Sequence, residues 1–391
     1  MSPRFSHRTP DRLDLNRLTR AVGRHRASGR PLYDLTQSNP TKVGLVHPPE
    51  VLEAMGGPGS LVYEPDAFGL FSARATVAHE LSGRGVEIAP DRVVLTASTS
   101  EAYSYLFKLL CDPEEEVLVP TPSYPLFEHL ARLVLVRAVP YPMDCHGVWS
   151  IDADKVARAV TPASRAVVVV SPNNPTGNYL KQDELAALID LCRARSLALI
   201  GDEVFFDYPL DPARAPVASL LGQEDVLTFS LGGLSKSAAL PQVKLGWMAI
   251  GGPAPEVGRA LERLELVADT YLSVSTPAQL AVAPLLAAGA GLRPRLLDRA
   301  RSNLAALRRL AAARPSCTVP PVEGGWSAVV QVPATRSDED LVLELLEIDG
   351  VLVHPGYFFD FPTEAYLVLS LIAPPDVFEA GASRVIERAC G

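Results

Sequence analysis

Cysteine is scarce in this chain, and the positions of its few cysteines exclude two kinds of site. Five cysteines occur in 391 residues, at Cys111, Cys145, Cys192, Cys317 and Cys390. They lie far apart, are odd in number and lack the close Cys or His spacing that binds zinc. We therefore expect neither a disulfide framework nor a metal site, and a reducing cytoplasm is the compartment that fits this cysteine content.

Long apolar runs are also missing. The N-terminal segment MSPRFSHRTPDR has no apolar core of the kind that a signal peptide carries. The most apolar later stretch, residues 279–292, is too short to span a bilayer and contains Pro284. The sequence thus predicts neither export nor a membrane as a partner.

Positive charge is not in excess. The chain has 36 Lys and Arg against 45 Asp and Glu, which gives a formal net charge of -9. A surface of this sign repels a phosphate backbone, so nucleic acid is not an expected partner. Small anionic ligands are not excluded, because a few local donors outweigh a distant net charge.

The length and the apolar content indicate a two-part α/β protein. A chain of 391 residues with 48% hydrophobic residues exceeds what one core usually organises. Short β-branched runs alternate with helical segments, and runs such as AVVVVS and LALIGD are apolar without alternation. Strands of that kind are covered on both faces, as in a mostly parallel sheet. The expected strands are residues 93–96, 117–120, 134–136, 166–171, 198–202, 227–230 and 246–250.

The segments on either side of this region have a different character. Arginines and leucines at helical spacing predict an amphipathic helix within residues 4–30. Beyond about residue 255, a long helical stretch is expected, followed by a helix over residues 300–313 with leucines at helical spacing. Short strands follow around residues 327–332, 351–353 and 366–371, so the C-terminal part reads as a smaller α+β region.

Ligand sites in open α/β sheets lie at the carboxyl ends of the strands, where two loops carry polar side chains of interest. In the first, Ser98, Thr99 and Ser100 lead into an apolar helix. They form either an anion cradle at the helix start or an ordinary N-cap. In the second, SPNNPTG, the proline that follows Asn174 holds it extended, so that its amide projects from the strand end or simply belongs to a tight turn.

Two further strand ends carry charge. Asp202 ends the apolar run LALIGD, and such a carboxylate is unfavourable there unless it meets a cation or caps a turn. Lys236 follows two glycines in SLGGLSK. A lysine becomes a nucleophile when burial or neighbouring cations lower its pKa, and otherwise it is a solvated surface residue.

In this order, these four loops resemble the fold type I pyridoxal phosphate (PLP) enzymes of the class I and II aminotransferases. The resemblance covers nearly the whole chain, through YEPDAFG, TASTSEA, PTPSYP, SPNNPTG, DEVF, SLGGLSK, KLGW, EGGW and VLVHPG. It implies a large PLP-binding α/β domain over residues 46–275 with a mostly parallel seven-stranded sheet. It also implies a smaller α+β domain built from both termini, residues 1–45 and 276–391.

The resemblance implies four catalytic residues. Lys236 would form the aldimine with PLP and later move the proton of the substrate α-carbon. Asp202 would pair with the pyridine nitrogen and keep the ring an electron sink. Asn174 would donate to the phenolic oxygen, and Tyr124 would stack on the ring.

The cofactor phosphate has its own expected partners. Ser98, Thr99 and Ser100 match the phosphate cradle, and Lys244 stands where relatives usually have an arginine, which keeps the charge but not the bidentate geometry. Tyr63 matches a tyrosine that reaches the phosphate of a second subunit. The resemblance therefore implies a homodimer with shared active sites.

Two departures concern the reacting end of the site. Phe205 replaces a tyrosine whose hydroxyl donates to the phenolic oxygen, a loss on the order of 1–2 kcal/mol. Val368 stands where relatives carry the arginine that binds the substrate carboxylate, and residues 364–372 contain no Arg or Lys. Lys42 and His354 border the pocket in relatives and are weak candidates for a substitute; the other reading is a solvated lysine and a turn histidine.

The resulting functional hypothesis is a cytoplasmic PLP-dependent aminotransferase that acts on a small amino donor and an oxo acceptor. The valine at position 368 leaves open a PLP-dependent lyase or another specialised PLP enzyme on a non-standard amino substrate. A PLP-sensing regulator without turnover is a third reading. The residues before Tyr33 are too few for a winged helix and a linker.

Overall fold

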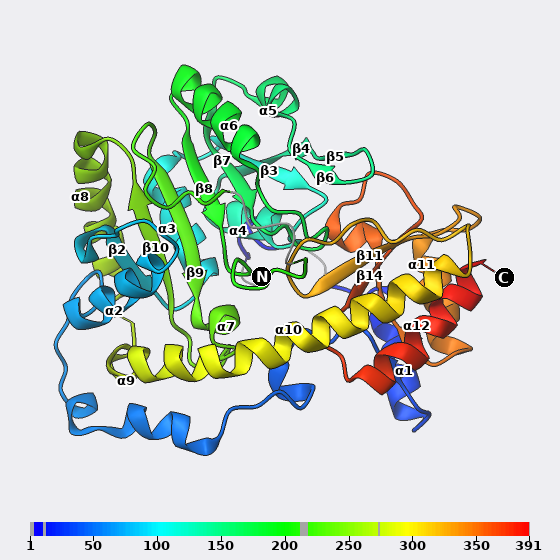
Figure 1. Cartoon of the computed structure of the whole chain (residues 1–391). Coiled ribbons are helices and arrows are strands. Elements are labelled where there is room, and N and C mark those ends of the chain that lie inside the picture. Colours follow the sequence, from blue (N-terminus) through cyan, green and yellow to red (C-terminus); the bar gives the residue numbers. More distant parts are fainter. Residues whose placement is uncertain (1–3, 11–12, 212–217, 273, 391) are drawn as a thin grey trace.

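A seven-stranded sheet forms the centre of the larger part of the molecule in this computed structural model, which describes residues 4–10, 13–211, 218–272 and 274–390 (Figure 1). The strand order is β2-β10-β9-β8-β7-β3-β4. Every strand pair is parallel except the two that involve β10. The strands are β2 (Val93–Thr96), β3 (Glu116–Thr121), β4 (Arg137–Pro142), β7 (Ser164–Val170), β8 (Ala198–Asp202), β9 (Thr228–Gly233) and β10 (Gly246–Gly251).

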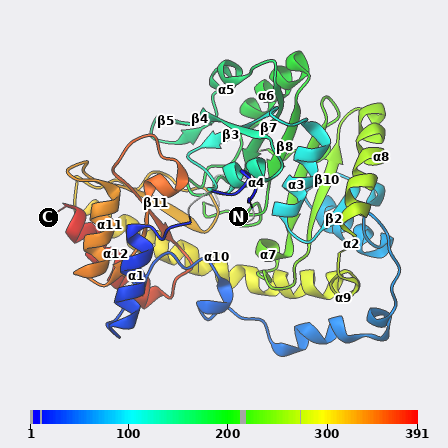
Figure 2. The same cartoon turned by 180° about the vertical axis from the view of Figure 1, so that it is seen from behind.

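Helices cover both faces of this sheet, as the two opposite views show (Figures 1 and 2). One face packs against α3 (Thr99–Leu110), α4 (Phe127–Leu133) and α8 (Ala254–Tyr271). The other face packs against α2 (Phe71–Ser82), α5 (Ala153–Ala159), α6 (Gln182–Arg195) and α9 (Thr276–Leu280). Neighbouring strand residues divide between the two layers, with Val94 in the first and Val93 in the second. The prediction of a mostly parallel sheet covered on both faces is confirmed.

One expected strand was placed wrongly. Residues 134–136 follow the end of α4 at Leu133 and form a turn, in which Leu135 has a left-handed φ of 65°. The strand begins only at Arg137 and lies at the edge of the sheet. Its sequence, RAVPYP, contains two prolines and exposed positions, which an edge strand tolerates and a central strand does not.

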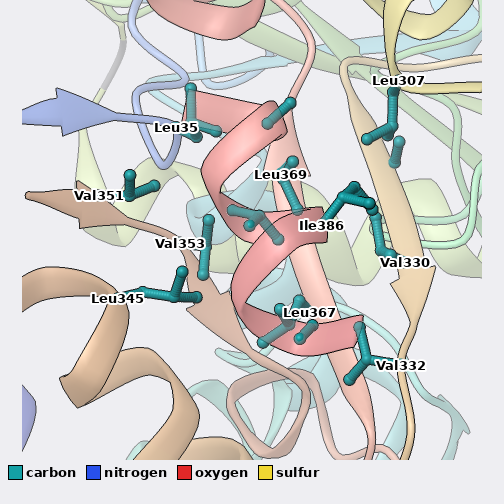
Figure 3. Packing of buried hydrophobic residues seen from close by; sticks show 14 of the residues in the cluster. Leu35, Leu307, Val330, Val332, Leu345, Val351, Val353, Leu367, Leu369 and Ile386 are labelled. Carbon is teal, nitrogen blue, oxygen red and sulfur yellow. The ribbon is translucent and has the colours of Figure 1, made fainter. Parts of the chain in front are cut away.

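A smaller α+β region contains segments from both ends of the chain. β1 (Tyr33–Asp34) pairs with β12 (Val351–Leu352), and a second sheet has the order β11 (Ser327–Gln331), β14 (Tyr366–Ser370), β13 (His354–Pro355). Its apolar core includes Leu35, Val353, Leu367 and Ile386 (Figure 3). The covering helices are α1 (Arg17–Ala27), α11 (Asp338–Glu347) and α12 (Pro375–Cys390). The domain boundaries given above stay predictions.

The two parts are connected by α10 (Val282–Ala312), a helix of 31 residues that runs from α9 to α12 (Figure 1). Its Gly289 lies against the turn that follows β9, where an added Cβ would clash with Ala238. Farther along, Asn303 donates to the carbonyl oxygens of Leu371 and Ala373, at 2.8 and 2.9 Å. One helix thus contacts both the larger sheet region and the segment after β14.

The remaining elements are short. They are α7 (Leu234–Ser237), β5 (Asp144–Cys145), β6 (Trp149–Ser150), η1 (Pro40–Lys42), η2 (Pro49–Gly56), η3 (Pro58–Leu61), η4 (Pro90–Arg92) and η5 (Gly356–Phe359). Of the helix expected within residues 4–30, the structure shows α1 alone; residues 11–12 lie outside the described part. Among the described helices, none combines the length and the apolarity that a bilayer span requires.

The cysteine expectation needs a correction. Cys317 and Cys390 form a disulfide, 73 residues apart in the sequence. Cys390 ends α12, which packs against α10, and Cys317 follows α10 closely in the chain. The packing of these two helices brings the cysteines together, which their wide spacing did not reveal.

Candidate active site

The chain places Asp202 at the carboxyl end of β8, in the middle of the larger sheet. Its side chain is buried, and it accepts hydrogen bonds from the Tyr103 hydroxyl at 3.0 Å and from the backbone N–H of Val204 at 3.1 Å. Burial raises the pKa of this carboxyl group, while the two hydrogen bonds and the charge of Lys236 act in the opposite direction. No described cation forms an ion pair with Asp202, so the carboxylate can accept a cationic partner.

Lys236 lies in α7, directly after β9, the strand beside β8. Its Nζ is 5.3 Å from the centre of the Phe205 ring and 5.0 Å from that of Trp326. Burial lowers the pKa of Lys236 to about 8, and the negative charge of Asp202 limits this decrease. The expected pair of carboxylate and amine is therefore brought together where the neighbouring central strands β8 and β9 end, with the amine against an aromatic wall.

The start of α3 provides free backbone donors beside this pair. Ser98 is the N-cap: its Oγ accepts from the N–H of Glu101 at 3.1 Å, and Glu101 accepts from the N–H of Ala97 at 2.6 Å. The ordinary N-cap reading of Ser98 therefore holds. The N–H groups of Thr99 and Ser100 have no acceptor among the described residues and lie at the positive end of the helix dipole, which suits a phosphate.

Tyr124 and Asn174 border the same space from other loops. Tyr124 is partly buried, and burial followed by the charge of Asp202 raises the pKa of its hydroxyl, while Ser100 lowers it. Asn174 accepts a hydrogen bond at 3.3 Å from Ser327, the first residue of β11. The Asn174 loop thus touches the smaller sheet. Buried Asn173 holds that loop by donating to the Pro122 carbonyl oxygen at 3.0 Å.

Two of the expected phosphate partners lie at the periphery. Lys244 is exposed in the turn before β10, with a φ of 61°. Gly246 pairs with Thr96 and packs so tightly that a Cβ would lie 3.1 Å from the carbonyl carbon of Ser98. The turn therefore approaches the start of α3. Tyr63 is 71% exposed and follows η3, on the outer surface of this single chain.

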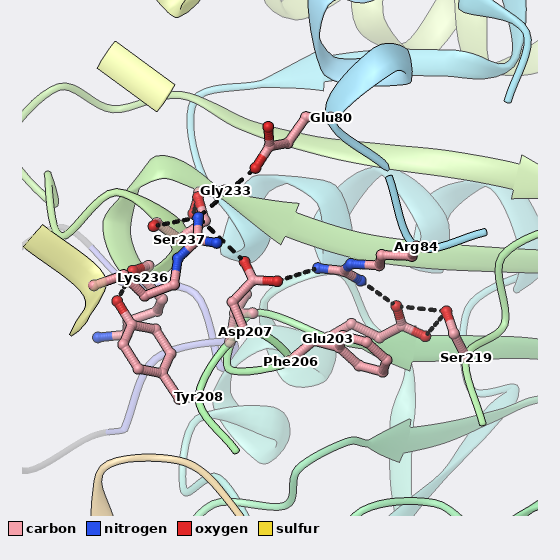
Figure 4. Close-up of polar contacts among 12 residues, drawn as sticks. Glu80, Arg84, Glu203, Phe206, Asp207, Tyr208, Ser219, Gly233, Lys236 and Ser237 are labelled. Atoms are coloured by element: carbon pink, nitrogen blue, oxygen red, sulfur yellow. Dashed lines mark hydrogen bonds and ion pairs between the residues drawn. The ribbon is translucent and has the colours of Figure 1, made fainter. Parts of the chain in front are cut away.

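The structure adds aromatic residues that the sequence reasoning missed. The Tyr208 hydroxyl donates to the Lys236 carbonyl oxygen at 2.6 Å (Figure 4). The Tyr208 ring lies edge-on to Trp326, with the ring centres 5.0 Å apart. Tyr103 supports Asp202, as described above. A signal for Tyr103 existed in the sequence, because it follows Thr99 by four residues and so lies on the same face of α3. No sequence pattern marks Tyr208.

A network of buried charge supports the chain segment behind Asp202 (Figure 4). Glu203 accepts from Arg84 at 2.9 Å and from the Ser219 hydroxyl at 2.8 Å. Arg84 also donates to Asp207 at 3.3 Å, and Arg293 of α10 donates to the Ser237 carbonyl oxygen at 3.2 Å. Ion pairs therefore hold the segment after Asp202, and a hydrogen bond from Arg293 holds the turn of Lys236.

The smaller sheet contributes an apolar residue at the position where the resemblance implies an arginine that binds the substrate carboxylate. Val368 is 2% exposed and pairs across the sheet with Val329 and His354. His354 is partly buried, and burial lowers its pKa, so it is mainly neutral at neutral pH. Lys42 is exposed in η1. Neither residue supplies a buried cation next to Val368.

This donor set fits pyridoxal phosphate. A buried carboxylate without an ion-pair partner suits the cationic pyridine nitrogen, and the free N–H groups of α3 suit a phosphate. A partly buried lysine with a lowered pKa suits a bond to the aldehyde carbon. Lys236, Asp202, Asn174, Tyr124 and the α3 residues would hold the cofactor.

Comparison with known proteins agrees with this chemistry. The family model for aminotransferase class I and II matches residues 34–373. Glutamate-pyruvate aminotransferase AlaA of Escherichia coli (strain K12) is 26% identical over 372 residues, covering 91% of this chain and 90% of that protein. Alanine aminotransferase of Mycobacterium tuberculosis (strain ATCC 25618 / H37Rv) is 29% identical over 363 residues, covering 89% and 83%.

The fold also matches a solved structure. An Escherichia coli aminotransferase superposes with a TM-score of 0.87 at 24% sequence identity, over 100% of this chain and 99% of that one. The expected fold type I architecture is confirmed, and so is the expected dependence on pyridoxal phosphate. The chain belongs to the class I and II aminotransferase family of PLP-dependent transaminases.

Proposed function

We propose that this transaminase uses Lys236 as the residue that bonds to the cofactor and moves the substrate proton. This proposal rests on one observation: the amine of Lys236 has a pKa lowered to about 8 and lies beside the buried carboxylate of Asp202. An amine of this pKa is partly neutral at neutral pH, and so can act both as nucleophile and as base. Bound pyridoxal phosphate supplies the electron sink that weakens the bond next to the substrate nitrogen.

The other side chains bind and orient. Asp202 would accept from the pyridine nitrogen, and Asn174 would donate to the phenolic oxygen. The partly buried ring of Tyr124 would pack on the cofactor. The charge of Asp202 raises the pKa of the Tyr124 hydroxyl, which supports a position of Tyr124 near Asp202. The phosphate would lie at the start of α3, on Ser98, Thr99 and Ser100, with Lys244 adding a charge from the β10 turn.

Glutamate as donor and pyruvate as acceptor form the first substrate pair to test, because a relative over 91% of the chain is named for this pair. Val368 favours a second candidate, elimination or decarboxylation of an amino substrate whose carboxylate is not bound by an arginine. An amino-acid panel decides between them. A stoichiometric oxo acid supports transamination, and release of ammonia or carbon dioxide supports the second candidate.

The role of Lys236 is tested by Lys236→Ala, with Lys108→Ala as the control. Lys108 lies on the exposed side of α3 and bonds to Ser104, away from the site. We expect Lys236→Ala to abolish turnover of every donor and Lys108→Ala to leave it unchanged. Wild-type turnover in Lys236→Ala would refute the assignment.

The enzyme is further proposed to work as a homodimer with shared sites. Leu61, Val62 and Tyr63 are 91%, 57% and 71% exposed, a concentration of apolar surface that a partner would cover. Mixing Tyr63→Ala with Lys236→Ala provides the test. A mixed dimer would hold one site with both residues intact, so activity above that of either parent supports sharing. Two inactive parents that stay inactive when mixed contradict it.

A cytoplasmic location is proposed from the free thiols of Cys111, Cys145 and Cys192. The Cys317–Cys390 disulfide is the observation against it. Alkylation of thiols at the moment of cell lysis distinguishes a reducing from an oxidising compartment. Reduced Cys317 and Cys390 in the lysate support the cytoplasm, and a disulfide already present there argues for an oxidising compartment.

A further inference from the structure

Trp326 forms part of the wall beside Lys236, and its position is tightly fixed. It is 2% exposed, and its ring lies edge-on to Phe205 at 5.3 Å and to Tyr208 at 5.0 Å. The Leu371 N–H donates to its carbonyl oxygen at 2.7 Å. The indole therefore has little freedom to turn towards another partner.

The indole N–H of Trp326 has no acceptor among the described residues. Its Nε1 is one of five buried side-chain polar atoms without a hydrogen-bond partner in the described part of the chain. A buried N–H of this kind is unfavourable unless a ligand or water pairs with it. Because Lys236 Nζ lies 5.0 Å from the same ring, the ligand that bonds to this amine is the obvious candidate.

The neighbouring aromatic residues supply no competing donor. Phe205 has no hydroxyl, and the Tyr208 hydroxyl is already bonded to the Lys236 carbonyl oxygen. The indole N–H is thus the free donor of the aromatic wall formed by Phe205, Tyr208 and Trp326.

We propose that Trp326 Nε1 donates a hydrogen bond to an anionic oxygen of the ligand held at Lys236. The oxygen belongs either to the cofactor, as its phenolic oxygen, or to the substrate, as its carboxylate. The inference rests on the proposed role of Lys236 and adds a binding residue to it. With either acceptor, the indole N–H takes the place of a donor that the resemblance implies: the tyrosine hydroxyl for the phenolic oxygen, or the arginine for the carboxylate.

A second orphaned indole provides a matched control. Trp149 Nε1 also lacks a partner, its residue is 3% exposed, and its ring lies edge-on to Phe361 at 5.9 Å. Trp149 lies in β6 and packs in a different apolar cluster from Phe205, Tyr208 and Trp326. Trp149→Phe therefore reports the effect of losing a buried indole outside the aromatic wall of the same protein.

The test compares Trp326→Phe with Trp149→Phe in cofactor-loaded protein. The first measurement is a pH titration of the visible absorbance of the cofactor without substrate. If the phenolic oxygen is the acceptor, loss of the donor raises the pKa of this titration by about 1 to 2. If the substrate carboxylate is the acceptor, that pKa is unchanged. KM for a carboxylate-bearing donor then rises roughly tenfold to a hundredfold, but KM for the corresponding amine without a carboxylate does not.

Either result supports the proposal when Trp149→Phe shows neither change. If Trp326→Phe and Trp149→Phe have the same pKa and the same KM, the proposal is refuted. The indole N–H of Trp326 would then face a neighbouring aromatic ring. A wild-type protein that takes up no cofactor would instead refute the proposed function. If Trp326→Phe fails to fold, site-specific replacement of Trp326 by benzothienylalanine keeps the ring shape and removes only the N–H, with the same two readouts.

Discussion

The hydroxyl of Tyr208 donates a 2.6 Å hydrogen bond to the backbone carbonyl oxygen of Lys236. Tyr208 follows Asp202 by six residues, so the segment that leaves β8 reaches across to the turn that leaves β9. The two charged side chains of the site are thus connected through the backbone as well as by their electrostatic interaction. A residue that touches neither cofactor nor substrate can in this way position the amine.

Tyr208→Phe is expected to lower kcat about tenfold while the affinity for cofactor changes little. The variant removes one hydrogen bond to the buried carbonyl oxygen of Lys236. The loss of this bond weakens the interactions that position Lys236 by about 1–2 kcal/mol. The measurement is kcat and KM over a range of pH. Tyr179→Phe is the control, because its hydroxyl donates to the Phe206 carbonyl oxygen at 2.8 Å. Equal losses of kcat in both variants would show a general packing effect.

Tyr103→Phe removes a hydrogen bond to Asp202, which should raise the pKa of this carboxyl group further and weaken its hold on the pyridine nitrogen. We expect the dissociation constant of pyridoxal phosphate to rise about tenfold, from the loss of one hydrogen bond to a charged group. Quenching of tryptophan fluorescence in apoprotein measures it. Tyr141→Phe loses a 2.8 Å bond to the Val168 carbonyl oxygen but none to Asp202, and it should bind the cofactor normally. Unchanged affinity in Tyr103→Phe would contradict the supporting role.

The lowered pKa of Lys236 predicts a pH dependence in apoprotein. The neutral amine is the reactive form, so the rate of bond formation with pyridoxal phosphate should rise with pH and level off above about 8. Asp202→Asn removes the charge that raises this pKa, and its plateau should begin at lower pH. Borohydride trapping of the bound cofactor gives the rates. A wild-type rate that still increases up to pH 10 would indicate an ordinary lysine.

Gly289 and Gly291 provide a pair of substitutions on one helix. A Cβ at Gly289 would clash with Ala238, whereas one at Gly291 meets nothing within 4 Å. Gly289→Ala should push α10 away from the Lys236 turn, lower the melting temperature and reduce kcat. Gly291→Ala should stabilise the helix by about 0.5–1 kcal/mol and leave kcat unchanged. Thermal unfolding and initial rates check both. A neutral Gly289→Ala would show that the turn does not depend on this contact.

The sequence predicted those parts of the fold that depend on local pattern. Central strands such as β7 and β8 are apolar on both faces and end in polar loops, so both the strands and the residues Asn174, Asp202 and Lys236 were found. The edge strand β4 was missed because prolines and exposed positions remove that pattern. The helical stretch after residue 255 was predicted, but its division into α8, α9 and α10 was not, and α10 continues without a break through the helix expected over residues 300–313.

Other features depend on contacts between distant segments. The bond from Tyr103 to Asp202 joins residues 99 apart, and the Cys317–Cys390 disulfide joins residues 73 apart. The unpartnered N–H of Trp326 is visible only once its neighbours are placed. Roles of the individual site residues stay predictions until the variants above are measured.

The long helix α10 sets a fixed distance within the enzyme. Arg293 donates to the Ser237 carbonyl oxygen in the turn that carries Lys236, and Asn303, ten residues on, holds the chain just after the strand of Val368. Ten helical residues correspond to about 15 Å. One extra residue between these anchors would rotate the second by about 100° and remove it from its carbonyl partners. Relatives that keep both Arg293 and Asn303 should therefore keep the number of residues between them, while the lengths of their loops vary elsewhere.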